Sequence, residues 1–302
     1  MASEIAAAGA RPHTWRHYFE LTKPKVVSLI VFTALVGILL AIGGGPVPWQ
    51  QAVAGLAGIA AAAAAGAVFN HAAEARTDAV MERTRGRPLP SGRVEAPQAL
   101  AFGSVLVLIS MALLVGFTNL LTALLTLASM VGYAVIYTVY LKRRTPQNVV
   151  WGGAAGAAPP LLGWCAITGS IDAEPLLLFL IIFTWTPPHF WALAIRRRED
   201  YARAGLPMLP VTHGVVFTKQ QILIYTIMLL AVSLLPFALG LHGLVYLAGA
   251  VLLGAGFLRH AWRLWRSEGD AHAMPTFRYS IFYLTVLFVL LLADAWLPAW
   301  HG

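Results

Sequence analysis

The chain has 302 residues, of which 59% are hydrophobic and only 11% are charged, and its mean hydropathy is +0.72. This composition excludes a soluble globular domain and indicates a polytopic membrane protein. The net charge of +8 does not indicate nucleic-acid binding, because basic residues in the cytoplasmic loops of a membrane protein give the same excess.

Apolar runs of bilayer-spanning length predict an all-α bundle of nine transmembrane helices. Residues 1–25 are expected to form a cytoplasmic N-terminal segment, and residues 26–302 a single transmembrane domain. The predicted spans are 26–42, 52–70, 98–117, 120–141, 149–168, 175–195, 221–240, 243–259 and 279–297.

All 21 Lys and Arg residues lie ahead of the first span or in alternate connections between spans. Because cytoplasmic loops are enriched in basic residues, this alternation places the N-terminus in the cytoplasm and the C-terminus outside. The long polar segments, 71–97, 196–220 and 260–278, all fall on the predicted cytoplasmic side. We therefore expect a multi-pass protein of the bacterial cytoplasmic membrane whose chemistry faces the cytoplasm.

The end of the second span carries Asn70, Glu74 and Asp78 at steps of four residues. Such steps stack side chains along one face of a helix. Oxygen ligands that converge at the end of a membrane helix suit Mg²⁺, and charge there is costly enough to indicate function. The competing interpretation is a helix end whose polar residues simply enter water, but the four-residue period favours the metal site.

Basic residues stand close to this acidic cluster. Arg83 and Arg87 follow it directly, and Lys142 ends the fourth span. Arginine binds phosphate oxygens in bidentate fashion, and a lysine ammonium neutralises a leaving phosphate as a point charge. The pattern predicts a diphosphate site beside the metal. Membrane topology also accounts for arginines in this loop, and snorkelling accounts equally well for a lysine at a helix end.

The sixth span contains a histidine that membrane insertion alone does not explain. His189 follows Pro187 and Pro188 about two turns inside the end of the span, and Arg196 and Asp200 come after it. An intramembrane histidine ligates iron, relays protons or satisfies a neighbouring helix through a hydrogen bond. Asp200 supplies a second carboxylate on the same predicted side of the membrane as the first cluster.

Together these two polar segments resemble the motifs of the UbiA superfamily of intramembrane prenyltransferases. The first motif of that superfamily reads Asn-Asp-x-x-Asp-x-x-x-Asp, and Asn70, Glu74 and Asp78 occupy its first, third and last ligand places, with His71 replacing the first Asp. The second motif, Asp-x-x-x-Asp, corresponds here to Arg196-x-x-x-Asp200. Loss of its first acid puts a complete second metal site in doubt. The resemblance spans essentially the whole chain and implies a nine-helix bundle.

Three blocks, at 78–89, 185–195 and 199–210, are similar to the branch of this superfamily that farnesylates heme. The resemblance implies that farnesyl diphosphate and heme B are the substrates. Transfer of the farnesyl group to a heme vinyl group, with addition of water, would yield heme O and diphosphate. The expected surroundings are the lipid bilayer and, as protein partner, an oxidase-assembly protein or a heme A synthase, without nucleic acid.

The same resemblance assigns roles to the candidate site residues. It implies Mg²⁺ as cofactor, and the expected metal-binding and catalytic side chains are Asn70, Glu74, Asp78 and Asp200. The side chains expected to bind the diphosphate and stabilise its growing charge are Arg83, Arg87 and Lys142. The heme is expected to contact His189 through its iron and Arg196 through its propionates, although a structural role for His189 is an equal alternative.

Two other functions remain open on the sequence. A UbiA-type polyprenyltransferase acting on a phenolic or quinone precursor would share the diphosphate chemistry and differ in its acceptor pocket. A heme-handling membrane protein or transporter without catalysis would share the broken helices and intramembrane polar residues. The block Trp185–Trp191 and the missing first Asp of the second motif argue against the first. The register of Asn70, Glu74 and Asp78 beside arginines argues against the second.

Overall fold

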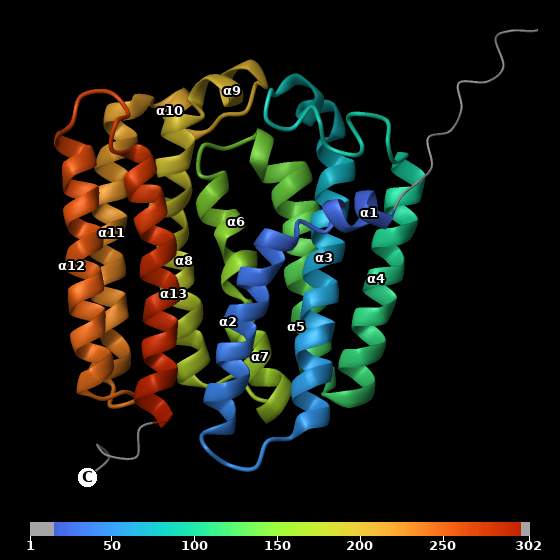
Figure 1. The fold of residues 1–302 in the computed structure, drawn as a ribbon, viewed down its shortest axis with the longest axis vertical. Coiled ribbons are helices and arrows are strands. Elements are labelled where there is room, and N and C mark those ends of the chain that lie inside the picture. The colour runs from blue at the N-terminus through green and yellow to red at the C-terminus, as the bar shows by residue number, and fades with distance from the viewer. Residues whose placement is uncertain (1–14, 297–302) are drawn as a thin grey trace, which may run out of the picture.

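The computed structural model describes residues 15–296, and all regular secondary structure in this part of the chain is helical (Figure 1). The first 14 residues of the predicted N-terminal segment and the end of the last predicted span lie outside the described residues. The helices are α1 (Trp15–Leu21), α2 (Pro24–Ile42), α3 (Trp49–Val80), α4 (Ala96–Phe117), α5 (Leu120–Val131), η1 (Gly132–Tyr140), η2 (Leu141–Arg143), α6 (Asn148–Ala157), α7 (Pro159–Thr168), α8 (Ala173–Arg196), α9 (Arg198–Arg203), α10 (Leu209–Thr212), α11 (Gly214–Ala238), α12 (Leu244–Arg266) and α13 (Ala273–Trp296).

Within the described part of the chain, eight helical segments are long and apolar enough to cross a membrane. They confirm the all-α membrane class and match eight of the nine predicted spans. The exception is the predicted span 149–168, which consists of two ten-residue helices, α6 and α7, that meet at Ala158. Pro159 and Pro160 start α7, and because a proline nitrogen carries no hydrogen, the backbone ladder is interrupted there.

The helices α2 and α7 cross so closely that two glycines at the crossing have no room for a side chain. A Cβ atom on Gly37 would collide with the Pro160 carbonyl, and one on Gly163 would collide with the Ala34 carbonyl. Small residues permit this approach, as is typical where membrane helices pack tightly. The crossing fixes the middle of α2 against α7, and both helices line the cavity described below.

The fourth span changes its helical type as it approaches the site. The α-helix α5 continues as the π-helix η1, which ends in the single 3-10 turn η2. Long π-helical stretches are rare and are concentrated at functional sites. This irregular end carries Lys142.

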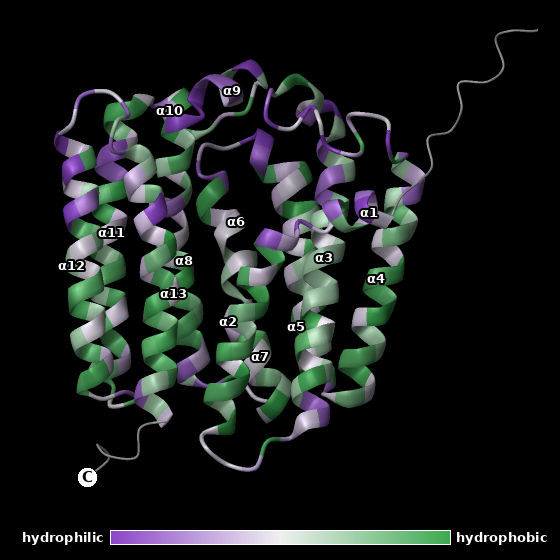
Figure 2. Ribbon diagram, in the orientation of Figure 1, coloured by the Kyte–Doolittle hydropathy of each residue, from purple (hydrophilic) through white to green (hydrophobic). Residues whose placement is uncertain are grey.

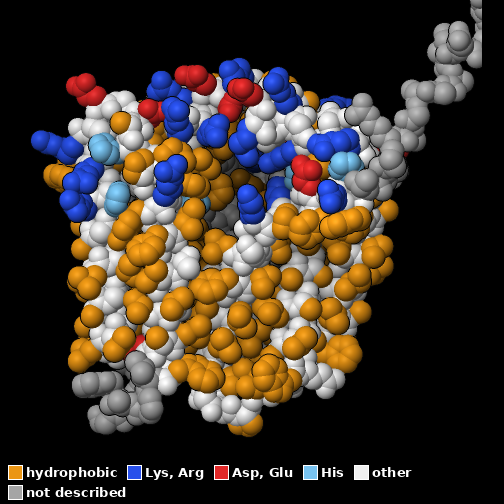
Figure 3. Space-filling model, viewed as in Figure 1, with side chains coloured by type: hydrophobic (Ala, Val, Ile, Leu, Met, Phe, Trp, Pro, Cys, Tyr) orange, Lys and Arg blue, Asp and Glu red, His pale blue; other side chains and the backbone are white. Residues whose placement is uncertain are grey.

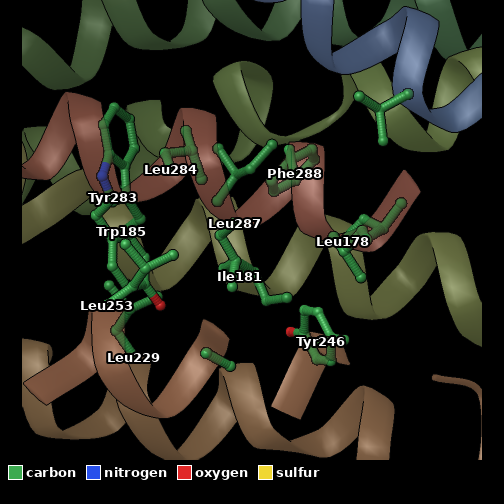
Figure 4. Packing of buried hydrophobic residues seen from close by; sticks show 14 of the residues in the cluster. Leu178, Ile181, Trp185, Leu229, Tyr246, Leu253, Tyr283, Leu284, Leu287 and Phe288 are labelled. Atoms are coloured by element: carbon green, nitrogen blue, oxygen red, sulfur yellow. The ribbon is translucent and has the colours of Figure 1, made fainter. Parts of the chain in front are cut away.

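A large apolar cluster joins α8, α11, α12 and α13 (Figure 4). Ile181, Tyr246, Leu287 and Phe288 in it are almost completely buried. The indole Nε1 of Trp185 donates a hydrogen bond to the Ser280 carbonyl at 2.8 Å, which satisfies the polar atom that this side chain brings into the core. The cluster makes α8 and α13 a rigid wall for the neighbouring cavity.

Polar residues gather at one end of the bundle (Figure 2). The same end carries the Lys and Arg side chains in the space-filling view, above a broad apolar belt (Figure 3). The helix α3 is 32 residues long, so it extends beyond the apolar belt into this polar end. The predicted acidic register therefore continues on one uninterrupted helix.

Candidate active site

A cavity of about 380 Å³ opens toward the polar end of the bundle. Figure 3 shows a hollow on this face just below the band of Lys and Arg side chains. Its deeper part is lined by apolar side chains of several helices, among them Ile30, Ile59, Met130 and Leu162. Its polar end is lined by Lys23, Asn70, Glu74, Asp78, Arg83, Arg87 and Lys142.

The three predicted oxygen ligands stand on one face of α3 and point into this cavity. Asn70, Glu74 and Asp78 are 2%, 7% and 1% exposed, so their burial reflects the cavity wall and not a helix end entering bulk water. Asp78 keeps one carboxylate oxygen, Oδ1, that is buried without a hydrogen-bond partner. A buried oxygen without a donor is ready to accept a cation.

Each of these three side chains pairs with a cation from another segment. Arg87 Nη1 lies 2.7 Å from Asp78 Oδ2, and the Lys142 ammonium pairs with Glu74 Oε1. The Lys23 ammonium donates a hydrogen bond to Asn70 Oδ1. The polar end therefore sets three cations, from the start of α2, the loop after α3 and η2, against two carboxylates and one amide of α3.

Lys23 is a functional candidate that the sequence analysis did not identify. It is the single non-glycine residue between positions 15 and 296 with a positive φ, at φ 51° and ψ 60°. Burial, and after it the neighbouring Arg87 guanidinium, lowers the pKa of Lys23 from 10.5 to about 7. Backbone strain in a non-glycine residue persists only where the surroundings impose it, and it concentrates at functional sites. The Lys-Pro step directly before the first span is the sequence signal that could have pointed to it.

The donor set fits Mg²⁺. Among the described residues there is no group of three or more His, Cys, Asp or Glu side chains that could hold a metal ion. The cavity offers two carboxylates and one amide oxygen, from Glu74, Asp78 and Asn70. Mg²⁺ commonly takes one or two carboxylates from the protein and fills its remaining positions with water and phosphate oxygens. The site is thus suited to a metal bound together with a phosphorylated ligand.

The sequence profile of the UbiA prenyltransferase family matches residues 30–300. The chain belongs to this family. The protoheme IX farnesyltransferase of Thioalkalivibrio sulfidiphilus is 61% identical over 292 residues, which cover 97% of this chain and 96% of the relative. That of Azotobacter vinelandii is 57% identical over 298 residues, which cover 99% of each chain.

Solved structures of the family share the fold. A digeranylgeranylglyceryl phosphate synthase superposes with a TM-score of 0.79 at 18% identity, covering 93% of this chain and 98% of that one. A UbiA homologue from Archaeoglobus fulgidus bound to DMAPP and Mg²⁺ gives a TM-score of 0.65 at 16% identity, covering 91% and 98%. These similarities confirm the UbiA-like fold implied by the sequence motifs.

The second UbiA motif lies at the rim of the cavity. Asp200 does not line the cavity, and it pairs with Arg203 and, at 4.0 Å, with Arg197. The next residue, Tyr201, does line the cavity, as does Met208. The segment around α9 therefore borders the mouth, but it does not bring Asp200 together with the three ligands of α3. Loss of the first acid of this motif agrees with a site built mainly on the first motif.

The predicted heme contacts are not among the residues that line the cavity. His189 does not line the cavity, but the adjacent residue Phe190 and the preceding turn's Thr186 do. The His189 ring stacks between Trp185 and Phe277. Arg196 is exposed, and its Nη1 lies 3.2 Å from Asp270 Oδ2.

Proposed function

We propose that the chain is a heme O synthase, which transfers a farnesyl group from farnesyl diphosphate to a vinyl group of heme B with addition of water. The observation that carries this proposal is identity of 57–61% over at least 96% of two relatives named protoheme IX farnesyltransferase. The cavity supports the same conclusion, because it joins a deep apolar part to a polar end rich in cations. An isoprenoid diphosphate has the same division between an apolar chain and a charged head.

The diphosphate head would bind at the polar end. Asn70, Glu74 and Asp78 would hold Mg²⁺, which when bound neutralises the charge of the diphosphate as it leaves. Arg83 is exposed at the mouth and Arg87 lines the cavity, so both guanidiniums can reach phosphate oxygens.

Donor binding would redistribute the existing ion pairs. Lys142, Arg87 and Lys23 hold the oxygens of Glu74, Asp78 and Asn70 in the described structure. When those oxygens hold a metal, the three cations become available to the diphosphate, where they stabilise charge that grows as the carbon–oxygen bond breaks. This stabilisation increases toward the transition state, so it lowers the barrier to bond cleavage.

The apolar part of the cavity would protect the farnesyl cation. Tyr133 and Tyr137 line the cavity with stacked rings whose centroids are 5.7 Å apart. Aromatic faces stabilise a nearby cation, and the surrounding apolar side chains exclude water that would quench it too early. The heme vinyl group would attack the cation, and water would then add to the resulting porphyrin-stabilised carbocation and release a proton to solvent, which leaves a hydroxyl group. His189 and Arg196 are proposed to hold the heme.

The membrane arrangement is part of the proposal. The helices α6 and α7 would together make a ninth crossing, with the N-terminus in the cytoplasm and the C-terminus outside. The grouping of basic side chains at the cavity end supports a cytoplasmic active site in the cell inner membrane, since cytoplasmic surfaces carry the excess of Lys and Arg.

Mass analysis of heme tests the proposed function. Purified protein is incubated with heme B, farnesyl diphosphate and Mg²⁺, with a Mg²⁺-free control and a parallel reaction that offers 4-hydroxybenzoate as acceptor. A Mg²⁺-dependent heme product heavier by one farnesyl group and one hydroxyl group is expected. Unmodified heme with prenylated benzoate would instead establish a phenolic-acceptor enzyme. No product from either acceptor, with correctly folded protein, would reject catalysis of this type.

A further inference from the structure

The imidazole of His189 is held in one orientation by its neighbours. Its ring centroid is 4.2 Å from that of Trp185, at an interplanar angle of 19°, and 4.6 Å from that of Phe277, at 27°. Its Nδ1 lies 2.6 Å from Ser280 Oγ. The Trp185 indole is itself hydrogen-bonded to the Ser280 carbonyl, so the stack is fixed to α13 at two points.

The hydrogen bonds of Ser280 define the tautomer of this histidine. A serine hydroxyl has one hydrogen to donate. The Ser280 hydroxyl donates it to the Phe277 carbonyl at 2.6 Å, so toward His189 it can only accept. Nδ1 of His189 must then carry the hydrogen in that contact, and in the neutral ring Nε2 carries the lone pair. Among the described residues, Nε2 forms no hydrogen bond, and the ring is partly exposed.

We propose that Nε2 of His189 is the axial ligand of the iron of the acceptor heme, and that Ser280 is the positioning residue that fixes the ring for this bond. This inference rests on the proposed function. A metal-bound histidine typically donates its other ring N–H to a fixed acceptor, which sets the tautomer and strengthens the ligand. Ser280, buried completely on α13, supplies that acceptor.

The position of His189 suits an acceptor that must reach the donor cavity. Thr186 and Phe190 of α8 and Leu284 of α13 line that cavity, and they flank His189 and Ser280 along the same two helices. A heme held at His189 therefore lies beside the cavity wall. His189 itself does not line the cavity, so a heme bound there would leave the space of the farnesyl chain free.

A cation stands at the right place for the carboxylates of the heme. Arg196 follows His189 by seven residues on α8, so the two side chains share a face about 10.5 Å apart along the axis. The Arg196 side chain is 59% exposed and pairs with Asp270, which is also exposed, so the guanidinium is available to a stronger partner. Heme is a planar apolar molecule with a metal at its centre and carboxylates at one edge, so it can contact His189 through the metal and Arg196 through a carboxylate.

Heme binding measured without farnesyl diphosphate tests this inference separately from turnover. Heme B is titrated into the purified full-length protein, and the Soret band gives affinity while resonance Raman of the ferrous form gives the iron–histidine stretch. His189→Ala is expected to lose the stretch and at least about 10-fold in affinity, and added imidazole should restore an axial ligand. His260→Ala is the matched control, since His260 also stacks on an aromatic ring of α13, with its centroid 4.6 Å from that of Tyr279.

Ser280 variants test the positioning role. Ser280→Ala is expected to keep the iron–histidine bond but to lower its stretching frequency and weaken heme binding about 10-fold, because Nδ1 loses its acceptor. Ser280→Thr, which keeps the hydroxyl, should restore both values. A purely structural Ser280 would leave the stretch of the bound heme unchanged, and that result would overturn the positioning role.

Two outcomes separate the inference from the function on which it rests, and one control checks the folding of the variant. Heme O formation by the wild type, together with an unchanged stretch and affinity in His189→Ala, would overturn the axial ligand and leave the enzyme activity standing. A His189-dependent stretch without heme O formation would overturn the proposed function. Retained farnesyl diphosphate binding by His189→Ala shows that a lost stretch reflects a lost ligand and not a misfolded chain.

Discussion

At the scale of single residues, the active-site cavity is organised by three oxygen-bearing side chains and the cations that hold them. The helical register of Asn70, Glu74 and Asp78 was predictable because four-residue steps have a fixed geometric meaning on a helix. Their partners were less predictable. Lys23 and Lys142 reach the ligands from segments distant in sequence, and only the packing of α2 and η2 against α3 brings them there.

Replacing Asp78 by Asn should nearly abolish farnesyl transfer. The variant keeps the shape of the side chain but loses the charge that would hold Mg²⁺ and pairs with Arg87. We expect turnover to fall at least about 100-fold, equivalent to roughly 2.7 kcal/mol of transition-state stabilisation. Mn²⁺ binding followed by electron paramagnetic resonance should weaken in parallel. Asp172→Asn, on an exposed loop away from the cavity, is the control and should behave as wild type.

Replacing Lys23 by Gly should separate stability from activity. Glycine adopts the left-handed conformation of this position without cost, and the substitution also removes a half-buried ammonium. We therefore expect an apparent Tm no lower than that of the wild type. The value of kcat/KM for farnesyl diphosphate should fall about 10- to 100-fold, because one charge-assisted hydrogen bond to the diphosphate is lost.

Lys25→Gly provides the opposite pattern. Lys25 is exposed in the first turn of α2, so glycine there weakens the helix but leaves the cavity unchanged. Its apparent Tm should fall slightly while kcat/KM stays near the wild-type value. If Lys23→Gly lost stability and kept its activity, Lys23 would be a structural residue and not a diphosphate ligand.

At the scale of helices, hydropathy predicted which segments span the membrane better than it predicted breaks and changes of helical type within them. Eight predicted spans appear as single long segments, since an apolar run of sufficient length has few alternatives in a membrane. The apolar composition of the span 149–168 favours one continuous helix. The span is divided because Pro159 and Pro160 interrupt the backbone hydrogen bonds of that helix. The π-helix η1 has no such sequence marker, because its apolar residues suit an α-helix equally well.

The tight α2–α7 crossing gives an element-level prediction. Gly163→Ala should lower the apparent Tm measurably and reduce turnover, because its Cβ would collide with the Ala34 carbonyl and force apart two helices that both line the cavity. Gly116→Ala on α4 is the matched control, since a Cβ there would meet nothing within 4 Å. Alanine also favours helix over glycine, so the control should be neutral or slightly stabilising. Equal Tm values for the two variants would contradict the role assigned to the crossing.

At the scale of the whole molecule, the protein is polarised along the bundle axis. The donor cavity opens at the end that carries the basic residues, while the connection between α2 and α3 lies at the opposite end (Figures 1 and 3). The alternation of Lys and Arg residues predicted this grouping, because insertion retains basic loops on the cytoplasmic side. The direction in which the protein is inserted then decides which compartment supplies farnesyl diphosphate.

Cysteine labelling tests that direction. Cys165 is buried and is the one cysteine of the chain, so Cys165→Ser gives a background for single exposed cysteines. Gln50→Cys, at the start of α3, should react with a membrane-impermeant maleimide in intact spheroplasts, whereas Glu268→Cys, between α12 and α13, should react only in inverted vesicles. Both positions are exposed, so differences in labelling report sidedness and not burial. The reverse pattern would place the cavity mouth outside the cytoplasm, where water-soluble diphosphates made in the cell could not reach it directly.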